Sequence, residues 1–404
     1  MESWKRSFFA VLAAEFLAVA GFNTSIPILP FYLQDLGVTD PTALKLWVGA
    51  CSAVVAVALA VFAPIWGRLA DSYGKRTMLL RAMLGGTVVL ALMGVVTSPW
   101  QLFILRGLQG ALTGTVAAAT VLVANITPRE QVGYWLGLLQ TGVYVGTSVG
   151  PAIGGIISDL FGRRITFFAT AGMLLAAALI VMRFVREEKM PRPPAGQFWA
   201  HMVPDFSPLA RSRPLLVILL VSGAVQVATS VVSPILPLFI QSLTPKATMV
   251  ATMTGLILGL SALSAALAAA GLGRVSTRIG YERTLHLCLW GGFLLFVPQA
   301  FVRTPLQLLL LRVLGGAFLG GTAPAINSLI AVRADRNRQG TVYGLSSSIN
   351  SAGAAVGPMI GASIAAALGY ASAFFATAAI LLVTAVGAGA LARGSRPGPA
   401  RRRY

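Results

Sequence analysis

Residues 27–31 read Pro-Ile-Leu-Pro-Phe, and residues 234–238 read Pro-Ile-Leu-Pro-Leu. An interval of about 206 residues also separates other matched positions, namely Gly67 from Gly273, Arg106 from Arg312, Gly114 from Gly320 and Gly150 from Gly357. Long apolar segments surround both copies. A parallel duplication of membrane-spanning halves is an architecture of solute carriers, with the binding site between the halves near the middle of the bilayer. The repeat therefore predicts a carrier.

The composition indicates an integral membrane protein. Hydrophobic residues make up 56% of the chain and charged residues only 11%, whereas about 25% is usual in soluble domains. Apolar segments of about 20 residues are each long enough to cross a bilayer core of about 30 Å as a helix. Twelve can be placed, near residues 7–33, 45–70, 78–96, 101–123, 133–157, 165–186, 214–241, 246–271, 284–302, 306–330, 340–367 and 370–392. The expected fold is all-α, with 12 transmembrane helices in two pseudo-symmetric six-helix bundles.

One extended polar stretch divides the chain. Residues 187–213 are rich in proline and charge and cannot build a core, so we expect a cytoplasmic linker there. This places an N-terminal bundle at 1–186 and a C-terminal bundle with a basic tail at 214–404. The other loops are short, so any chemistry must lie within the spans or at their ends.

The net charge of +19 raises the question of a nucleic-acid partner, which the distribution of the 31 Lys and Arg answers. With the N-terminus in the cytoplasm, most of them fall in the tails and inner loops. Five fall in outer loops and two within spans: Lys45, Arg163, Arg164, Lys246 and Arg303, and then Arg106 and Arg312. This is the positive-inside pattern, so we expect both termini to be cytoplasmic and the partner to be the lipid bilayer, with no nucleic acid.

The chemistry-bearing residues argue against an enzyme. The two cysteines lie in separate halves and the two histidines are isolated, so neither a disulfide framework nor a metal site follows. The spans contain no paired acids, histidine cluster or activated nucleophile. No Walker-type nucleotide loop is present, and we expect no cofactor.

Three charged residues lie well inside the expected spans, namely Glu15, Arg106 and Arg312. Glu15 is eight residues beyond Ser7, or about 12 Å along a helix, where desolvation penalises a charged carboxyl. Such acids are candidate proton sites, although Glu15 can also simply line a wet vestibule. Arg106 lies about six residues into the fourth span, so its guanidinium must face protein or a water-filled cavity. Its alternative role is to brace carbonyl groups between helices, which is the role we favour for Arg312.

The loop after the second span reads Gly-Arg-Leu-Ala-Asp-Ser-Tyr-Gly-Lys-Arg over residues 67–76. Its small residues allow close packing, its acid can bind a positive helix terminus, and its last two residues are expected to face the cytoplasm. We interpret it as a conformational latch formed by Gly67, Asp71, Gly74, Lys75 and Arg76. The copy at 273–280 has no acid. The alternative is a basic turn that only sets topology.

The fifth span is rich in glycine. Its pattern consists of Gly137, Gly146, Gly150, Pro151, Gly154 and Gly155. Glycines recur at every fourth residue from 142 to 154, which gives a small-residue face that lets another helix approach closely. Proline removes a backbone donor and bends the helix. Ordinary packing of a glycine-rich membrane helix is the alternative.

Several polar and aromatic residues of the spans are candidates for the wall of a central cavity. They are Phe22, Asn23, Phe31, Gln140, Tyr144, Gln226, Asn327 and Asn350. Aromatic residues that face lipid look the same in sequence.

Three of these segments resemble signatures of the major facilitator superfamily. Residues 67–76 resemble its loop motif G-x-L-A-D-R-x-G-R-K, with Ser72 in place of the usual arginine. Residues 106–110 resemble the R-x-x-Q-G motif associated with proton transfer, and residues 137–155 match G-x8-G-x3-G-P-x2-G-G, which marks antiporters and exporters. The surroundings of Glu15 are similar to the first span of several multidrug–proton antiporters.

The chain thus resembles the twelve-span drug–proton antiporter branch of this superfamily. The resemblance implies a monomeric multidrug exporter of a bacterial inner membrane that exchanges small lipophilic drugs for protons by alternating access. It implies that Glu15 and Arg106 couple the two fluxes. Export of a specific metabolite, such as a sugar, amino acid or lipid, stays open, as does a receptor that has kept the fold without transport.

Overall fold

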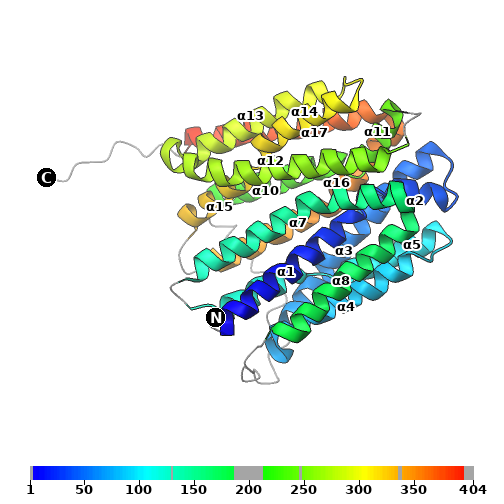
Figure 1. Ribbon diagram of the computed structural model, residues 1–404. Coiled ribbons are helices and arrows are strands. Elements are labelled where there is room, and N and C mark those ends of the chain that lie inside the picture. The colour runs from blue at the N-terminus through cyan, green and yellow to red at the C-terminus, as the bar shows by residue number, and fades with distance from the viewer. Residues whose placement is uncertain (1–2, 129–130, 186–212, 245–247, 335–338, 395–404) are drawn as a thin grey trace.

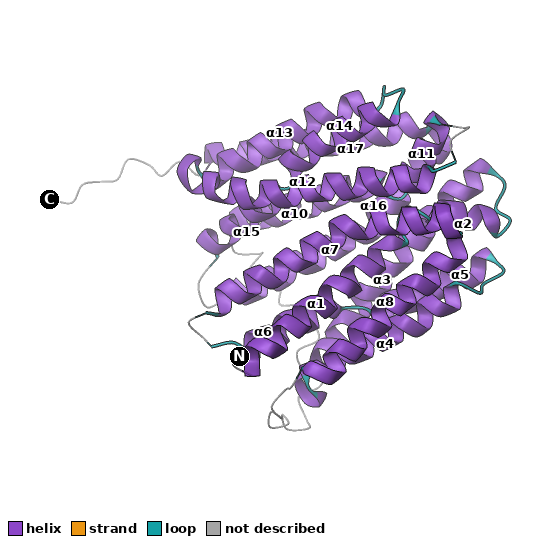
Figure 2. Ribbon diagram, viewed as in Figure 1, coloured by secondary structure: helices purple, strands orange, loops and turns teal. Residues whose placement is uncertain are grey.

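The computed structural model describes residues 3–128, 131–185, 213–244, 248–334 and 339–394, and the regular structure in them is helical (Figure 2). The first group of helices is α1 (Ser3–Thr24), α2 (Leu29–Asp35), α3 (Pro41–Tyr73), α4 (Lys75–Met93), α5 (Pro99–Leu112), α6 (Thr115–Ile126), α7 (Val132–Phe161) and α8 (Arg163–Phe184). The second is α10 (Arg213–Val232), α11 (Leu236–Leu243), α12 (Val250–Ile279), α13 (Tyr281–Gln299), α14 (Pro305–Leu319), α15 (Thr322–Arg333), α16 (Gln339–Leu368) and α17 (Tyr370–Gly394). We call these groups the N-terminal half and the C-terminal half.

Helices lie at all twelve expected spans. Ten segments of the described chain are long and apolar enough to cross a membrane. The spans expected at 133–157 and 284–302 are not among the ten, but they correspond to α7 and α13, which pack within the same bundles. The expected linker, apart from Arg213, and the basic end of the tail lie outside the described residues.

Some spans that the sequence predicts as continuous are broken. The fourth span is two helices, α5 and α6, joined at Thr113 and Gly114. Gly114 has φ +116°, a left-handed conformation that glycine adopts without the steric cost of a Cβ atom. The break therefore starts a new helix at Thr115 in the middle of the span and turns its N-terminal end toward the interior.

Each half is held by its own helix packing, and the halves meet along two helix pairs. In the N-terminal half α1 packs against α7 and α8, and in the C-terminal half α10 packs against α16 and α17. Across the boundary α7 packs against α12, and α3 against α16 (Figure 1).

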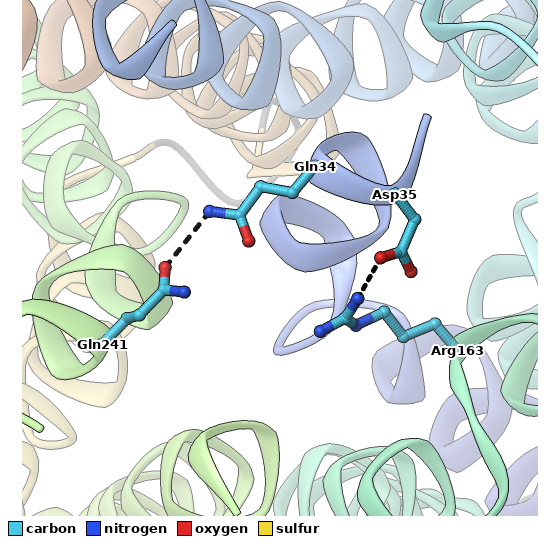
Figure 3. Close-up of polar contacts among 4 residues, drawn as sticks. All are labelled: Gln34, Asp35, Arg163 and Gln241. Atoms are coloured by element: carbon cyan, nitrogen blue, oxygen red, sulfur yellow. Dashed lines mark hydrogen bonds and ion pairs between the residues drawn. The ribbon is translucent and has the colours of Figure 1, made fainter. Parts of the chain in front are cut away.

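The bundle has two ends that differ in contacts. We call one the Asp35 end, where α2, α4, α7 and α11 finish, and the other the terminus end, where α1 and α7 begin and α6 and α15 finish (Figure 1). At the Asp35 end Gln34 Nε2 donates to Gln241 Oε1 at 3.2 Å and so joins the halves (Figure 3). The backbone of Gly255 in α12 also lies against that of Pro151 in α7. These contacts close the Asp35 end.

Candidate functional site

A cavity of about 910 Å³ lies between the two halves. Side chains from α1, α3, α5, α6 and α7 line one wall, and side chains from α10 and α16 line the other. Most of the wall is apolar, with hydroxyl and amide groups between the apolar residues. Among the described lining residues Arg106 alone is charged. Such a cavity suits an apolar molecule with a few polar groups.

Three of the eight predicted cavity residues line the central cavity, and two line a separate pocket. Phe22, Asn23 and Gln226 line the central cavity. Asn327 and Asn350 line a smaller polar pocket of about 360 Å³ in the C-terminal half, and Gln226 is part of both walls.

Phe31, Gln140 and Tyr144 line neither the central cavity nor the smaller pocket. Phe31 is 3% exposed, lies in the core near the Asp35 end, and has the Arg163 guanidinium 5.6 Å from its ring centre. Tyr144 is 42% exposed. Its neighbour Val143 lines the cavity, and one residue on a helix is a rotation of about 100°. Gln140 lies about one turn nearer the terminus end than Val143.

Glu15 lies just behind the cavity wall. It is 1% exposed, and Thr115 Oγ1 donates a hydrogen bond to Glu15 Oε1 at 2.8 Å. The other carboxyl oxygen has no hydrogen-bond partner among the described residues. Thr115 is the first residue of α6 and itself lines the cavity. One hydroxyl group therefore separates the carboxyl group from the cavity.

Arg106 lies on the wall itself and is 6% exposed. Its Nη1 donates to Ser25 Oγ at 3.3 Å and to Gln109 Oε1 at 3.1 Å. Ser25 lies ten residues after Glu15, which corresponds to roughly 15 Å along a helix. The structure thus buries both expected coupling residues at one cavity but does not bring them into contact.

The glycine pattern of α7 faces two neighbouring helices. A Cβ atom added at Gly146 would lie 3.0 Å from the Phe16 carbonyl oxygen in α1, and one added at Gly150 would lie 2.9 Å from Asn23 Cβ. Gly154 lies against the Thr24 backbone, as the predicted close helix approach requires.

The same pattern also reaches the other half of the protein. Gly155 lies against Ala251 of α12, so the end of the pattern contributes to the contact between halves. Gly137 differs, because a Cβ atom there would have no neighbour within 4 Å.

The predicted latch segment is only partly described. The Asp71 side chain and the surroundings of Gly67 lie outside what the structure describes. Gly74, with φ +94°, forms the turn between α3 and α4. The Lys75 side chain is 8% exposed, and the half-buried Arg76 donates from Nη2 to the Met182 carbonyl oxygen at 2.8 Å. Both lie in the first turn of α4. That they lie on the cytoplasmic side stays a prediction.

Sequence reasoning missed several hydroxyl residues of the site, among them Thr115, Ser25 and Ser230. Thr115 binds Glu15, Ser25 binds Arg106, and Ser230 lines the opposite wall. Each is a hydroxyl residue in an apolar span, and many other positions of the chain show the same pattern.

Comparisons with known proteins find relatives that cover nearly the whole chain. The family model of the Major Facilitator Superfamily matches residues 11–251 and 218–403. A multidrug resistance protein MdtG from Enterobacter lignolyticus is 36% identical over 384 residues, covering 95% of this chain and 91% of that protein. The protein of the same name from Klebsiella pneumoniae is also 36% identical, with 95% and 93% covered.

Solved structures share the fold. The chain is similar to a bacterial homolog of the human lysosomal transporter Spinster, crystallised in an inward-facing and unoccupied conformation, with a TM-score of 0.80, 14% identity and 99% and 100% of the two chains covered. It is also similar to the nucleoside transporter NupG, with a TM-score of 0.78, 14% identity and 97% and 100% covered.

Proposed function

The chain belongs to the Major Facilitator Superfamily, and on this premise we propose that it is a proton-coupled exporter of small lipophilic or amphiphilic drugs. It is a multi-pass membrane transporter related to multidrug resistance proteins, and it is not an enzyme. The drug substrates, the protons and the direction of transport are the proposal.

The contact of Glu15 with Thr115 carries the proposal. A carboxyl group that is 1% exposed within a membrane-spanning helix is costly to maintain and is by default a functional group. It lies behind a hydroxyl that lines a cavity large enough for a drug. Protonation can therefore respond to the cavity, and a change in the Glu15 charge can alter the cavity wall through one hydrogen bond.

The proposed cycle is alternating access. The positive-inside pattern makes the Asp35 end the outer side, with both termini cytoplasmic. The contacts at the Asp35 end then correspond to an inward-facing carrier that takes up drug from the cytoplasm or inner leaflet. After the halves rock, a proton from outside binds Glu15, drug leaves, and the protonated carrier returns. We propose a monomer in a bacterial inner membrane as the working unit.

A specific metabolite is the second candidate substrate. The smaller pocket in the C-terminal half is lined by uncharged hydrogen-bonding groups, including Gln226, Asn327 and Asn350. Such a wall also suits a hydroxyl-rich or amide-bearing metabolite.

The proposal can be tested with purified protein in liposomes under an imposed pH gradient without nucleotide. A panel of lipophilic drugs and a panel of sugars and amino acids would be assayed for uphill movement. We expect gradient-dependent movement of several chemically unrelated drugs, in the direction opposite to protons. Movement of a single metabolite only would support the second candidate, and equal rates with and without the gradient would contradict proton coupling.

A further inference from the structure

Asp159 occupies an unfavourable end of its own helix. It lies in the last turn of α7, where the negative helix terminus disfavours an acid. Its Oδ2 instead accepts a hydrogen bond of 2.7 Å from the Thr252 amide of α12, in the other half. Thr252 is the third residue of that helix. Its amide is one of the first four N–H groups, which have no partner within the helix, so Asp159 caps a helix that belongs to the opposite half.

Lys45 makes the opposite contact at the same end of the molecule. It is the fifth residue of α3, near a positive helix terminus that disfavours a cation. Its Nζ donates to the Ala365 carbonyl oxygen at 3.0 Å, and Nζ is also 4.7 Å from the centre of the Tyr370 ring. Ala365 is in the last turn of α16, which ends at Leu368, and its carbonyl oxygen also accepts from the Gly369 amide at 3.1 Å. The negative end of a helix favours a cation. Lys45 therefore caps a second helix of the opposite half.

We propose that Lys45 and Asp159 form an electrostatic latch that holds the Asp35 end closed; this rests on the proposed alternating access. Both charged groups come from the N-terminal half and both receiving helix ends come from the C-terminal half. The residue that matches Lys45 in the second copy of the repeat is Ala251. The charge at position 45 is therefore not a feature that the two halves share. Each contact stabilises a helix end only while the halves touch. Opening the Asp35 end removes both contacts.

The latch is suited to reversible opening. Lys45 and Asp159 are both half-buried, so water can solvate them once the halves separate. Fully buried charges would pay a larger cost for any rearrangement. The neutral contact of Gln34 with Gln241 lies at the same end and opens with them (Figure 3).

The same end contains a natural control. Asp35 forms an ion pair with Arg163, and both residues belong to the N-terminal half (Figure 3). Because this pair does not cross between the halves, rocking leaves it intact. Neutralising it changes the charge at the Asp35 end as much as neutralising the latch does, without removing a contact between halves.

The experiment measures distances between spin labels in liposomes, without drug and without a gradient. One label pair, Val95→Cys with Leu306→Cys, reports the Asp35 end, and a second, Tyr134→Cys with Val332→Cys, reports the terminus end. All four positions are exposed, and the native Cys51 and Cys288 are buried and so protected from label. The latch variant is Lys45→Gln with Asp159→Asn, and the control variant is Asp35→Asn with Arg163→Gln.

We expect the ratio of open to closed Asp35 ends to rise about two- to fivefold for each charge removed from the latch, and the terminus-end distances to shorten in step. The fold-changes of the two single variants should multiply in the double variant, because the two contacts share no residue. The control variant should keep the wild-type distributions. Size-exclusion profiles and melting curves of all variants verify folding.

Unchanged distances in the folded latch variant, or an equal shift in the control variant, would overturn the latch. Should the latch variant fail to fold, Lys45→Gln alone is compared with Arg163→Gln alone, and the latch again requires a shift in the first and none in the second. Since the assay contains neither drug nor proton gradient, its result is separate from that of the transport assay. A carrier that moves no protons can still open its Asp35 end, and a coupled carrier can still lack this latch.

Discussion

The two halves share a helix arrangement but place different chemistry at matched positions. Ser222 stands 207 residues after Glu15, the interval that separates Gly150 from Gly357. Where Glu15 accepts a hydrogen bond from Thr115, Ser222 Oγ donates to Asn350 Oδ1 at 2.8 Å. The first contact contains a titratable group and the second is neutral. Under the proposed function, we expect the N-terminal half to handle protons and the C-terminal half to contribute to substrate selection.

The two arginines that match in the repeat, Arg106 and Arg312, also have different surroundings. Arg106 lines the cavity and donates hydrogen bonds to Ser25 and Gln109. Arg312 lies 5.5 Å from the ring centre of Phe296 and 6.0 Å from that of Phe374, with its Nε and Nη2 atoms buried and without hydrogen-bond partners among the described residues. One arginine belongs to a polar network at the cavity, and its repeat partner belongs to an aromatic core.

The largest effect is expected for Glu15→Gln. The amide keeps the shape and can still accept from Thr115, but it cannot carry a proton between the two sides. Uphill drug transport should fall to background, whereas exchange of labelled for unlabelled drug without a gradient should continue. Ser222→Ala is the matched variant and should keep uphill transport. Wild-type uphill transport by Glu15→Gln would remove Glu15 from coupling.

Arg106→Met comes next and should slow transport at least about tenfold, since hydrogen bonds from a charged donor are worth about 1.5–3 kcal/mol each. Arg312→Met should stay within about twofold of wild type, because an apolar chain of similar length in an aromatic core is often neutral or stabilising. Initial rates of drug uptake in liposomes measure both. An equal fall in the uptake rate of the two variants would contradict a difference in role between Arg106 and Arg312.

Gly150→Leu should be less severe and should act on packing. Its side chain has no space between α7 and α1, and overpacking typically costs about 1–3 kcal/mol. We expect a leak of protons or drug, or a carrier held in one conformation, measured as passive flux and as coupled export. Gly137→Leu is the control within the same motif, because its position is open. Similar damage from both would contradict a role for Gly150 in close helix packing.

The smallest effect is expected in the C-terminal half. Ser222→Ala removes a hydrogen bond worth about 1 kcal/mol that orients Asn350 at the polar pocket. Drug KM values should change by up to about fivefold, unequally among drugs, with the ratio of protons to drug unchanged. A uniform fall in rate for every drug would instead indicate a general loss of folded carrier.

Much of the fold could be predicted from the sequence because membrane spans depend on length and apolarity alone. The glycine face of α7 was also predictable, since its four-residue spacing fixes one side of a helix. The break before Thr115 was not, because the repeat marks Gly114 as the match of Gly320 but does not indicate the left-handed backbone that interrupts the helix there. That break is what brings Thr115 to Glu15.

The site could be predicted only in part, because burial in protein and exposure to lipid favour the same residues. Phe31 is of a residue type that often lines cavities, but it lies in the core. Tyr144 is adjacent in sequence to Val143, which lines the cavity, but does not line it itself. Lys45 counted in the sequence as an outer-loop charge, whereas its partner is a carbonyl group about 320 residues away in the chain. Such contacts depend on how the halves dock, which helix periodicity does not specify.

The most direct test of the central claim is proton movement in liposomes that contain the purified wild-type protein and an internal pH indicator, with drug added to one side only and neither nucleotide nor an imposed gradient present. Proton-coupled antiport predicts that each drug gradient drives protons in the opposite direction, in a fixed ratio to the drug moved, and that Glu15→Gln liposomes move drug without protons. Drug movement with no proton movement in the wild type, or protons moving in the same direction as drug, would contradict proton-coupled antiport.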